Sequence, residues 1–410
     1  MRSEWKQTKL RNMVTFNPKL SLPKGSFAKK VAMEHLSPHT KYVTKFELSS
    51  YTGGAKFMNG DTLLARITPC LENGKTSQVT LLNEGEIGFG STEFIVLRAK
   101  DGIADKDFIY YLATSSQFRD YAIKSMVGSS GRQRVQQDVL ENMYIDCPSI
   151  PEQKAIAAVL SALDDKIELN NRINKNLEAQ AQAIFKSWFV DFEPFRDGEF
   201  VDSELGPIPK GWRVGQLSEI GTIVGGATPS KSKDEYYIES NRGIAWITPK
   251  DLSINKNKFI SHGKIDITDL GYRNASTKLM PAGSVLFSSR APIGYMAIAD
   301  NELCTNQGFK SIIPEKVIGT SFVYYTLKFN LDTIQNLGSG STFKEVSGSV
   351  MKSLNVLIPD LHIVNKFDKV CKPLLSKQKS LEYQSQTLVA IRDTLLPKLM
   401  SGEIRVPLEV

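Results

Sequence analysis

Few residues in this chain occur in patterns that support catalysis. No GxxxxGK[ST] phosphate loop is present, and Gly88-Phe89-Gly90 lacks the third glycine of a dinucleotide-binding loop. The Asn-Pro-Pro-aromatic and Asp-Pro-Pro-aromatic signatures of amino-methyltransferases are absent as well. Neither HExxH nor a paired metal-binding spacing occurs among the four histidines, His35, His39, His262 and His362. The patterns therefore predict a chain that is not catalytic by itself and binds no metal.

Two acid-x-Lys tripeptides are the strongest candidates for an enzyme active site. Glu152-Gln153-Lys154 and Asp164-Asp165-Lys166 have the spacing seen in metal-dependent nucleases. Both fall in a long helical segment rather than on a strand beside a second acid, and such tripeptides are common. A metal-dependent two-domain nuclease is thus the alternative of the enzyme class. Cleavage of DNA by the purified chain with magnesium would favour it.

Two pairs of loops carry residue types suited to DNA binding. Residues 65–75 and 288–295 each place an arginine at the end of an expected strand, before a loop with proline and glycine. Arginine can donate two hydrogen bonds to guanine or contact a phosphate. The loops GSSGRQR (128–134) and GSGSTFK (338–344) combine small residues, hydroxyls and cations that suit phosphate contact. A local ion pair and a plain flexible turn are the alternatives for these two pairs.

The predicted DNA-binding residues are Arg66, Thr68, Lys75, Ser129, Ser130, Arg132, Arg134, Lys250, Ser289, Arg290, Tyr295, Ser341, Thr342 and Lys344. Arg66 and Arg290 are expected to serve opposite halves of a target. If each makes a bidentate base contact, replacing it by alanine should cost about 1–3 kcal/mol. Equal losses on matched and scrambled half-sites would identify both as phosphate anchors.

A long amphipathic helix is expected over 151–190. Pro151 suits the first helical turn. Apolar or small residues recur at steps of three and four, interrupted only at Asn170 and Asn174. At about 1.5 Å per residue the helix would run roughly 55–60 Å, too long for the core of one globular domain. The helix therefore needs a partner along its length.

A second helix of matching length is expected over 361–397, with Asp360 as its cap and Pro397 at its end. Its apolar residues keep a 3-4 spacing typical of a coiled coil, with polar interruptions at Lys377 and Gln384. We expect the two helices to pair. The predicted seam residues are Ile156, Leu160, Leu163, Ile167, Leu177, Ile184, Phe367, Leu374, Leu381, Leu388 and Leu395.

The chain also contains a diverged internal duplication. The run Gly60 to Arg66 has a counterpart from Gly283 to Arg290, and the loop from Gly128 has one from Gly338, in the same order. Strands are expected at 63–67 and 91–99 and a helix at 106–122, so each repeat is a mixed α and β domain. The predicted division is 1–150 and 211–360 for two recognition domains, 151–190 and 361–397 for the helices, 191–210 for an acidic linker and 398–410 for a tail.

Composition is consistent with a DNA-binding protein without requiring one. The net charge is +7, which many globular enzymes also carry. No segment has the length of a membrane span or the core of a signal peptide, so a soluble, cytoplasmic protein is expected. The four cysteines are widely scattered and are expected to be free thiols. The aromatic residues of 185–195 are expected to pack against the second recognition domain, the alternative being a docking patch for a partner.

Taken together, several runs resemble the specificity subunit of type I restriction-modification systems, over nearly the whole chain. These runs are GDTLLARITPCLENGK from Gly60, GSTEFIVLR from Gly90, IPEQKAIAAVLSALDDKIELNNRIN from Ile150, FKSWFVDFEPF from Phe185, GPIPKGW from Gly206, GGATPS from Gly225, WITPKDL from Trp246, SSRAPIGY from Ser288, GSGSTFKEV from Gly338 and LLPKLMSGEI from Leu395.

The resemblance implies two target recognition domains, each of which reads half of a split target in double-stranded DNA, and two helices in an antiparallel coiled coil. It implies no cofactor on this chain. Two modification subunits would bring S-adenosylmethionine and methylate adenine at N6, and would recruit restriction subunits that use ATP and magnesium. The opening LHIVNKF of the second helix lacks the usual Glu-Gln pair, which leaves open whether both helices engage modification subunits alike. A scaffold that binds only proteins is the third alternative.

Overall fold

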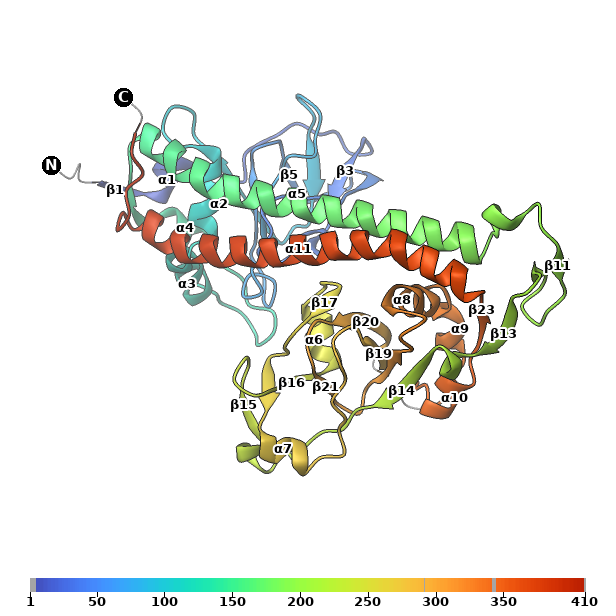
Figure 1. The fold of residues 1–410 in the computed structure, drawn as a ribbon. Coiled ribbons are helices and arrows are strands. Elements are labelled where there is room, and N and C mark those ends of the chain that lie inside the picture. Colours follow the sequence, from blue (N-terminus) through green and yellow to red (C-terminus); the bar gives the residue numbers. More distant parts are fainter. Residues whose placement is uncertain (1–4, 291, 341–343, 409–410) are drawn as a thin grey trace. The chain divides into compact units, whose positions relative to one another are not determined.

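The computed structural model describes residues 5–290, 292–340 and 344–408 (Figure 1). The chain divides into two compact units: unit 1 comprises residues 1–169 and 385–410, and unit 2 comprises residues 170–384. Two long helices, α5 (Ile150–Phe189) and α11 (Leu361–Met400), each contribute one part to each unit. The helices are therefore not separate from the globular domains, as the predicted division had them, but are part of both cores.

The globular part of unit 1, here module 1, runs from β1 to β10. Its elements are β1 (Lys6–Lys9), α1 (Leu10–Met13), β2 (Val14–Phe16), β3 (Phe27–Val31), η1 (Met33–His35), β4 (Glu47–Ser50), β5 (Ala55–Phe57), β6 (Thr62–Ala65), β7 (Thr76–Gln78), β8 (Gly88–Gly90), β9 (Phe94–Ala99), α2 (Lys106–Thr114), α3 (Ser116–Lys124), α4 (Gln137–Glu141) and β10 (Tyr144–Cys147). Two four-stranded sheets have the orders β2-β9-β6-β7 and β4-β3-β8-β5, and β1 pairs with β10.

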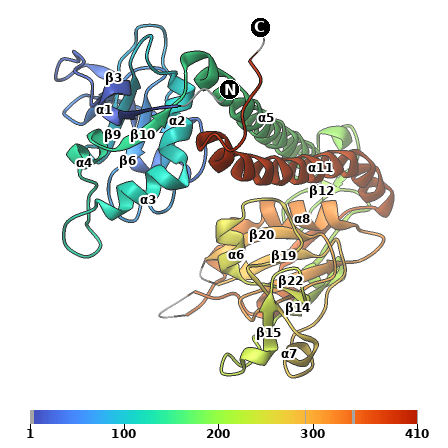
Figure 2. The same cartoon turned by 90° about the vertical axis from the view of Figure 1, so that its left-hand side faces the viewer.

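The globular part of unit 2, here module 2, runs from β13 to β23 and follows the connector strands β11 (Phe200–Val201) and β12 (Ile208–Pro209) and the short η2 (Glu193–Phe195). Its elements are β13 (Arg213–Gln216), η3 (Leu217–Glu219), β14 (Gly221–Gly225), η4 (Asp234–Tyr236), β15 (Tyr237–Glu239), β16 (Ile244–Ile247), α6 (Pro249–Ile254), β17 (Phe259–Ile260), β18 (Ile265–Ile267), α7 (Asp269–Arg273), β19 (Val285–Ser289), β20 (Ile293–Ala299), β21 (Cys304–Thr305), β22 (Lys310–Pro314), α8 (Thr320–Phe329), α9 (Leu331–Asn336), α10 (Gly348–Lys352) and β23 (Asn355–Ile358). Its main sheets have the orders β14-β22-β19-β20-β17 and β15-β18-β16-β21. Figure 2 labels β14, β22, β19 and β20 of the first sheet.

Strand pairing shows that the two modules share one architecture. β6 lies between β9 and β7 as β19 lies between β22 and β20. The registers match too, because Thr62 pairs with Leu97 and Val285 pairs with Ile312. The outer pair β1–β10 recurs as β13–β23. The predicted duplication and the mixed α+β fold class are thus confirmed.

The helix predicted over 106–122 is two helices, α2 and α3. Asp105 caps α2 by accepting from the backbone N–H groups of Asp107 and Phe108, both at 3.0 Å. Ser115 then breaks the segment, because its extended backbone ends α2 while its hydroxyl accepts from the N–H of Phe118 at 3.3 Å and begins α3. A single serine with capping geometry overrides the helical spacing of the apolar residues.

The long helices form close to their predicted bounds, with one error at the C-terminal end. Asp360 caps α11 as expected, accepting from the N–H of His362 at 2.7 Å. Pro397, however, does not end α11, which continues to Met400, so the predicted tail at 398 begins three residues too early. Leu399 and Met400 are buried in the core of unit 1. This burial offsets the helix-breaking cost of proline, about 3 kcal/mol.

Within unit 2 the two helices run antiparallel. Asn170 donates to Gln384 at 2.9 Å, and Gln378 donates to the Asn174 carbonyl at 3.1 Å. The rings of Phe185 and Phe367 lie 5.7 Å apart. As the residue number rises on α5 it falls on α11, so the resemblance was right about the direction of pairing.

The buried face of α11 differs from a strict coiled-coil seam. Of the predicted seam residues, Ile156, Leu160, Phe367 and Leu381 are buried, and the other seven are half-buried. Val370 and Ile391, which follow the 3-4 spacing, are each 43 % exposed, whereas Cys371, Gln378 and Arg392 are buried. Each helix packs against a module as well as against the other helix. The contact with the modules makes the buried face of α11 wider and turns it away from the residues that follow the 3-4 spacing.

The aromatic residues near the end of α5 pack inside unit 2. Phe185 and Phe189 are buried with Trp212, Phe322 and Phe367 in one hydrophobic core, against which Trp188, Phe192 and Phe195 also pack. The aromatic residues of 185–195 therefore pack within unit 2, as expected, and do not form an exposed docking patch. Among the described residues, no helix is both long and apolar enough to cross a membrane.

Candidate nucleic-acid interface

The two loops singled out in each repeat lie side by side. In module 1, the N–H of Val135 donates to the carbonyl of Arg66 at 2.8 Å, and the N–H of Thr68 donates to the carbonyl of Gln133 at 3.0 Å. In module 2, the N–H of Val346 donates to the carbonyl of Ser289 at 3.0 Å. Loops far apart in sequence thus form one edge in each module.

Register shows that Arg66 and Arg290 are not equivalent positions. Because Val135 bonds to Arg66 as Val346 bonds to Ser289, the counterpart of Arg66 is Ser289. Ile67 pairs with Arg134 as Arg290 pairs with Glu345, so Arg290 is the counterpart of Ile67 and Glu345 is the counterpart of Arg134. The pairing of the two arginines in the sequence comparison was one residue out of register. The same backbone frame therefore presents different side chains in the two modules.

Two of the predicted contact arginines pair with carboxylates at this edge. Arg134 donates to both oxygens of Glu93, with its Nη2 2.7 Å from Oε1, and this hydrogen bond lowers the pKa of Glu93. Arg290 lies 3.4 Å from Glu345. Both pairs are partly open to solvent, so they position the loops and are weak enough to be exchanged for another partner.

The other predicted residues divide into engaged and exposed groups. Ser289 is wrong as a contact residue, since it is fully buried and donates to the Gly308 carbonyl at 3.2 Å. Thr68 donates to Glu72 at 2.9 Å, and Lys75 donates to the Met33 carbonyl at 2.9 Å. Tyr295 is half-buried, with the Lys256 ammonium 4.5 Å from its ring.

Five predicted residues are exposed on loops or on a helix. They are Ser129, Ser130, Arg132, Lys250 and Lys344. Ser341 and Thr342 lie outside the described residues. The tip of the loop at Ser129–Arg132 therefore offers two hydroxyls and one cation to a ligand, whereas module 2 offers Lys344 at the equivalent loop.

Arg66 lines a basic cleft of about 420 Å³ with Lys19 and Lys56. No carboxylate is among the lining residues, and Nε of Arg66 is buried without a hydrogen-bond partner in the described structure. Lys56 is held over the Tyr51 ring and donates to the Leu20 carbonyl at 2.6 Å. Sequence reasoning missed both lysines, because neither belongs to a repeated run. Three cations around a groove fit a backbone phosphate.

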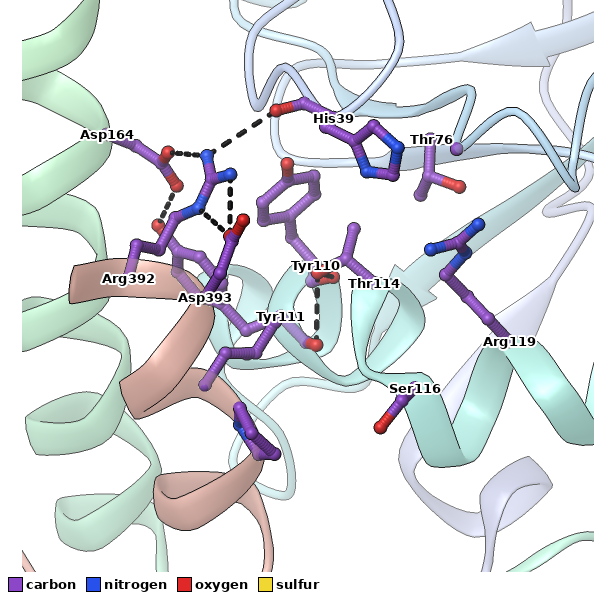
Figure 3. A pocket seen from close by; sticks show the side chains of 13 residues that line it. His39, Thr76, Tyr110, Tyr111, Thr114, Ser116, Arg119, Asp164, Arg392 and Asp393 are labelled. Carbon is purple, nitrogen blue, oxygen red and sulfur yellow. Dashed lines mark hydrogen bonds and ion pairs between the residues drawn. The ribbon is translucent and has the colours of Figure 1, made fainter. Parts of the chain in front are cut away.

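A buried polar cluster anchors module 1 to the helix pair (Figure 3). Arg392 on α11 donates to Asp164 on α5 at 2.7 Å, and the Tyr111 hydroxyl on α2 donates to the other Asp164 oxygen at 2.7 Å. Lys41 lies 5.2 Å from the Tyr111 ring centroid and donates to Ser161 on α5 at 2.6 Å. All five side chains thus tie one module to both helices.

A related cluster anchors module 2. Lys258 forms an ion pair with Glu178 on α5 and donates to Gln378 on α11 at 2.8 Å. The Tyr325 hydroxyl donates to Glu178 at 3.0 Å. Burial alone would raise the pKa of Glu178, but Lys258 and Lys328 outweigh it and lower that pKa to about 2. Glu178 is therefore a carboxylate at neutral pH.

The two clusters are related by the duplication. Tyr42, next to Lys41, pairs with Gln78 of β7, and Phe259, next to Lys258, pairs with Ile298 at the same point of β20. The sequences Lys-Tyr-Val and Lys-Phe-Ile, and the repeats FIYY and FVYY that end at Tyr111 and Tyr325, were detectable signals that sequence reasoning overlooked. Each module thus uses the same lysine and tyrosine positions to hold the helices.

The two carboxylates on which a nuclease site would depend, Glu152 and Asp164, form ion pairs and hydrogen bonds within the fold. Glu152 pairs with Arg405 at 2.5 Å and bonds to Ser149, while Asp164 is shared between Arg392 and Tyr111. Among the described residues, no group of three or more His, Cys, Asp or Glu side chains is placed to hold a metal ion. This geometry gives the alternative no support.

Comparison with known proteins agrees with the repeated architecture. A family described as the type I restriction modification DNA specificity domain matches residues 2–179 and again residues 209–383. The chain belongs to this family. It is a DNA specificity subunit with two repeated recognition domains, and it is not catalytic by itself.

Similar relatives are specificity subunits. The chain is 28 % identical to the type I restriction enzyme HindI specificity subunit of Haemophilus influenzae, over 84 % of this chain and 86 % of that protein. It is 40 % identical to the MjaIX specificity subunit of Methanocaldococcus jannaschii, over 39 % of this chain and 37 % of that protein. The crystal structure of the S subunit from M. genitalium, 17 % identical and covering 97 % of both chains, has the same fold with a TM-score of 0.57.

Proposed function

We propose that each module reads one half of a bipartite target in double-stranded DNA, and that the helix pair sets the spacer between the halves. The observation that carries this proposal is that the paired loops have the same backbone hydrogen bonds in both modules but different side chains at matching positions. Arg66 and Arg134 in module 1 stand where module 2 has Ser289 and Glu345. One scaffold with two sets of contacts suits two different half-sites. Helices α5 and α11 pass through both units, which supports a fixed spacing.

We further propose that the helix pair recruits two modification subunits, and through them the restriction subunits. In this proposal S-adenosylmethionine, ATP and magnesium belong to those partners, and adenine N6 is the methylated atom. The chain would act in the cytoplasm, where it meets cellular DNA. The exposed faces of α5 and α11 support this assignment, because Leu169, Val370 and Ile391 are apolar and more than a third exposed.

Within module 1 we assign two kinds of contact. Arg66, Lys19 and Lys56 hold a backbone phosphate in the basic cleft, and Ser129, Ser130 and Arg132 reach the bases. In module 2, Arg290 and Lys344 reach the bases. Phosphate contacts position a protein on DNA, whereas base contacts specify the sequence.

This division makes a prediction for the complex with its modification subunits. Arg132→Ala should weaken binding by about 1–3 kcal/mol when half-site 1 is intact, and by much less when that half is scrambled. Arg290→Ala should do the same for half-site 2 only. Competition binding with duplexes scrambled in one half measures both. Equal losses on every duplex would show that neither residue reads bases.

The double variant Lys19→Ala, Lys56→Ala is the matched contrast. It should weaken binding to all duplexes alike and reduce the steepness of log K against log salt by up to about 0.9, the contribution of the one phosphate that the cleft holds. An unchanged salt slope would remove the basic cleft from the interface. Failure of the complex to prefer any duplex would contradict the proposed function itself.

A further inference from the structure

Unit 1 contains a partly open cavity of about 340 Å³, to which Gly74 of the 65–75 loop contributes one side. The turn at His39, strand β7, helices α2 and α3, and the C-terminal part of α11 supply its walls. In Figure 3, the side chains of His39, Thr76 and Arg119 lie around one space, with Tyr110 and Thr114 on the α2 side of it. The volume is in the range of small-ligand sites.

Two polar groups in this wall are buried without a protein partner. Thr76 is 1 % exposed, and its hydroxyl oxygen has no hydrogen-bond partner in the described structure. Nε of Arg119 is also buried without a partner. The other hydrogen bonds of Arg119 go to the carbonyls of Leu71 and Glu72, at 3.5 and 3.1 Å. Arg119 is half-buried, and no described carboxylate lies within ion-pair distance of it, so its charge is partly desolvated without a counter-charge.

His39 is exposed overall, and its imidazole lines the cavity beside Gly74. A Cβ added at Gly74 would lie 2.4 Å from Cε1 of this ring, so the ring packs flat against the glycine backbone. His39 itself has a φ of 55°, a left-handed conformation that is uncommon outside glycine. Burial and the nearby Arg119 lower the pKa of the ring, which favours its neutral form. A neutral imidazole offers one donor and one acceptor.

The remaining charges around the cavity limit the charge of a ligand. Arg392 donates to both Asp164 and Asp393, so these three groups carry one net negative charge on the α11 side. Arg119 supplies one positive charge on the α3 side. A singly charged anion beside Arg119 would complete the pairing, whereas a multiply charged one would be repelled by Asp393.

We propose that this cavity is a binding site for a small organic anion with a single carboxylate group, seated on Arg119, His39 and Thr76. The group would accept from Arg119 Nε and the Thr76 hydroxyl. The space left over admits a short organic remainder beside Leu396 and Pro397 of α11. Because module 1 and α11 both line the cavity, an occupant would strengthen the attachment of this module to the helices. The site goes beyond DNA recognition and does not depend on it.

Calorimetric titration of the full chain without DNA tests the proposal. Acetate and inorganic phosphate are the probes, with chloride at the same ionic strength as reference, and acetate should bind more tightly than phosphate, which carries more than one negative charge above neutral pH. Arg119→Met should weaken the binding at least about tenfold, because it removes a charge-assisted hydrogen bond. Thr76→Val, which keeps the shape of the side chain, should weaken it less. In NMR, the ring protons of His39 should shift on binding, and His39→Gln identifies those signals.

The matched control is Arg11→Met, which removes an exposed arginine of unit 1 that does not line the cavity. It should bind the probes as the unaltered chain does. The proposal is overturned if acetate does not bind above the chloride reference, if phosphate binds more tightly than acetate, or if Arg11→Met loses as much as Arg119→Met. It is also overturned if duplex DNA, and no small anion, shifts the His39 signals. If Arg119→Met does not fold, Thr76→Val and the His39 signals decide.

Discussion

Replacing Arg392 by leucine should lower the free energy of unfolding of unit 1 by about 3–5 kcal/mol. Arg392 and Asp164 form a buried pair whose side chains are 10 % and 5 % exposed. Removal of the cation leaves Asp164 buried, and among the described residues the Tyr111 hydroxyl is then its remaining side-chain partner. Breaking one side of a buried ion pair is among the most destabilising changes known in proteins, because the remaining charge stays desolvated. Hydrogen exchange of the α2 amides in urea reports the change.

Two further variants separate the ion pair from a general packing defect. Arg405→Leu breaks a pair with Glu152 that is 36 % exposed on the arginine side, so its cost should stay below about 1 kcal/mol. The double variant Asp164→Leu, Arg392→Leu removes both charges and should recover a large part of the loss. If the single and double variants unfold alike, the cluster contributes through shape and not through charge.

Glu178→Gln should destabilise unit 2 by about 3 kcal/mol at neutral pH and by progressively less in acid. The pKa of Glu178 is lowered from 4.5 to about 2 in the folded chain. A lowered pKa stabilises the fold above the unfolded value, and this stabilisation is lost as the pH falls from about 4.5 toward 2. Each pKa unit corresponds to about 1.4 kcal/mol. Urea unfolding followed by the fluorescence of Trp188 and Trp212 measures the difference at each pH.

Glu382→Gln is the control with the opposite sign. Burial raises the pKa of Glu382, although its carboxylate accepts from the N–H groups of Lys258 and Phe259 at 2.8 and 3.1 Å. A raised carboxyl pKa makes the ionised form unfavourable in the fold, so its contribution to stability decreases as the pH rises above 4.5. The two variants should therefore show opposite pH trends. Parallel trends would contradict the assigned roles of both carboxylates.

Local and repeated signals were predictable from the sequence. The duplication, the two long helices and the loops around Arg66 and Gly128 follow from spacing and from motifs that occur twice. Equivalent residues in the two repeats were harder to predict. A shift of one residue between two similar strands changes which residues correspond, while the motif around them still looks the same. This is why Arg66 was matched with Arg290 and not with Ser289, and why a buried serine entered the predicted interface.

Features created by tertiary packing were not predictable from spacing. Pro397 lies inside α11 because Leu399 and Met400 are buried beyond it, and no local signal reports that burial. The basic cleft joins Lys19, Lys56 and Arg66, which come from separate turns and strands. The anchors at Lys41 and Lys258 did have a repeated signal, but a lone lysine before an aromatic residue gives no indication of burial among tyrosines.

The central claim is that this chain selects a bipartite DNA target for its modification partner. Mapping of N6-methyladenine in genomic DNA tests it most directly, in cells that express the partner with the chain, without it, and with Arg290→Ala. The account predicts methylation at two short half-sites with a constant spacer, lost without the chain and relaxed in one half by the variant. The same methylated motifs in cells without the chain would contradict it.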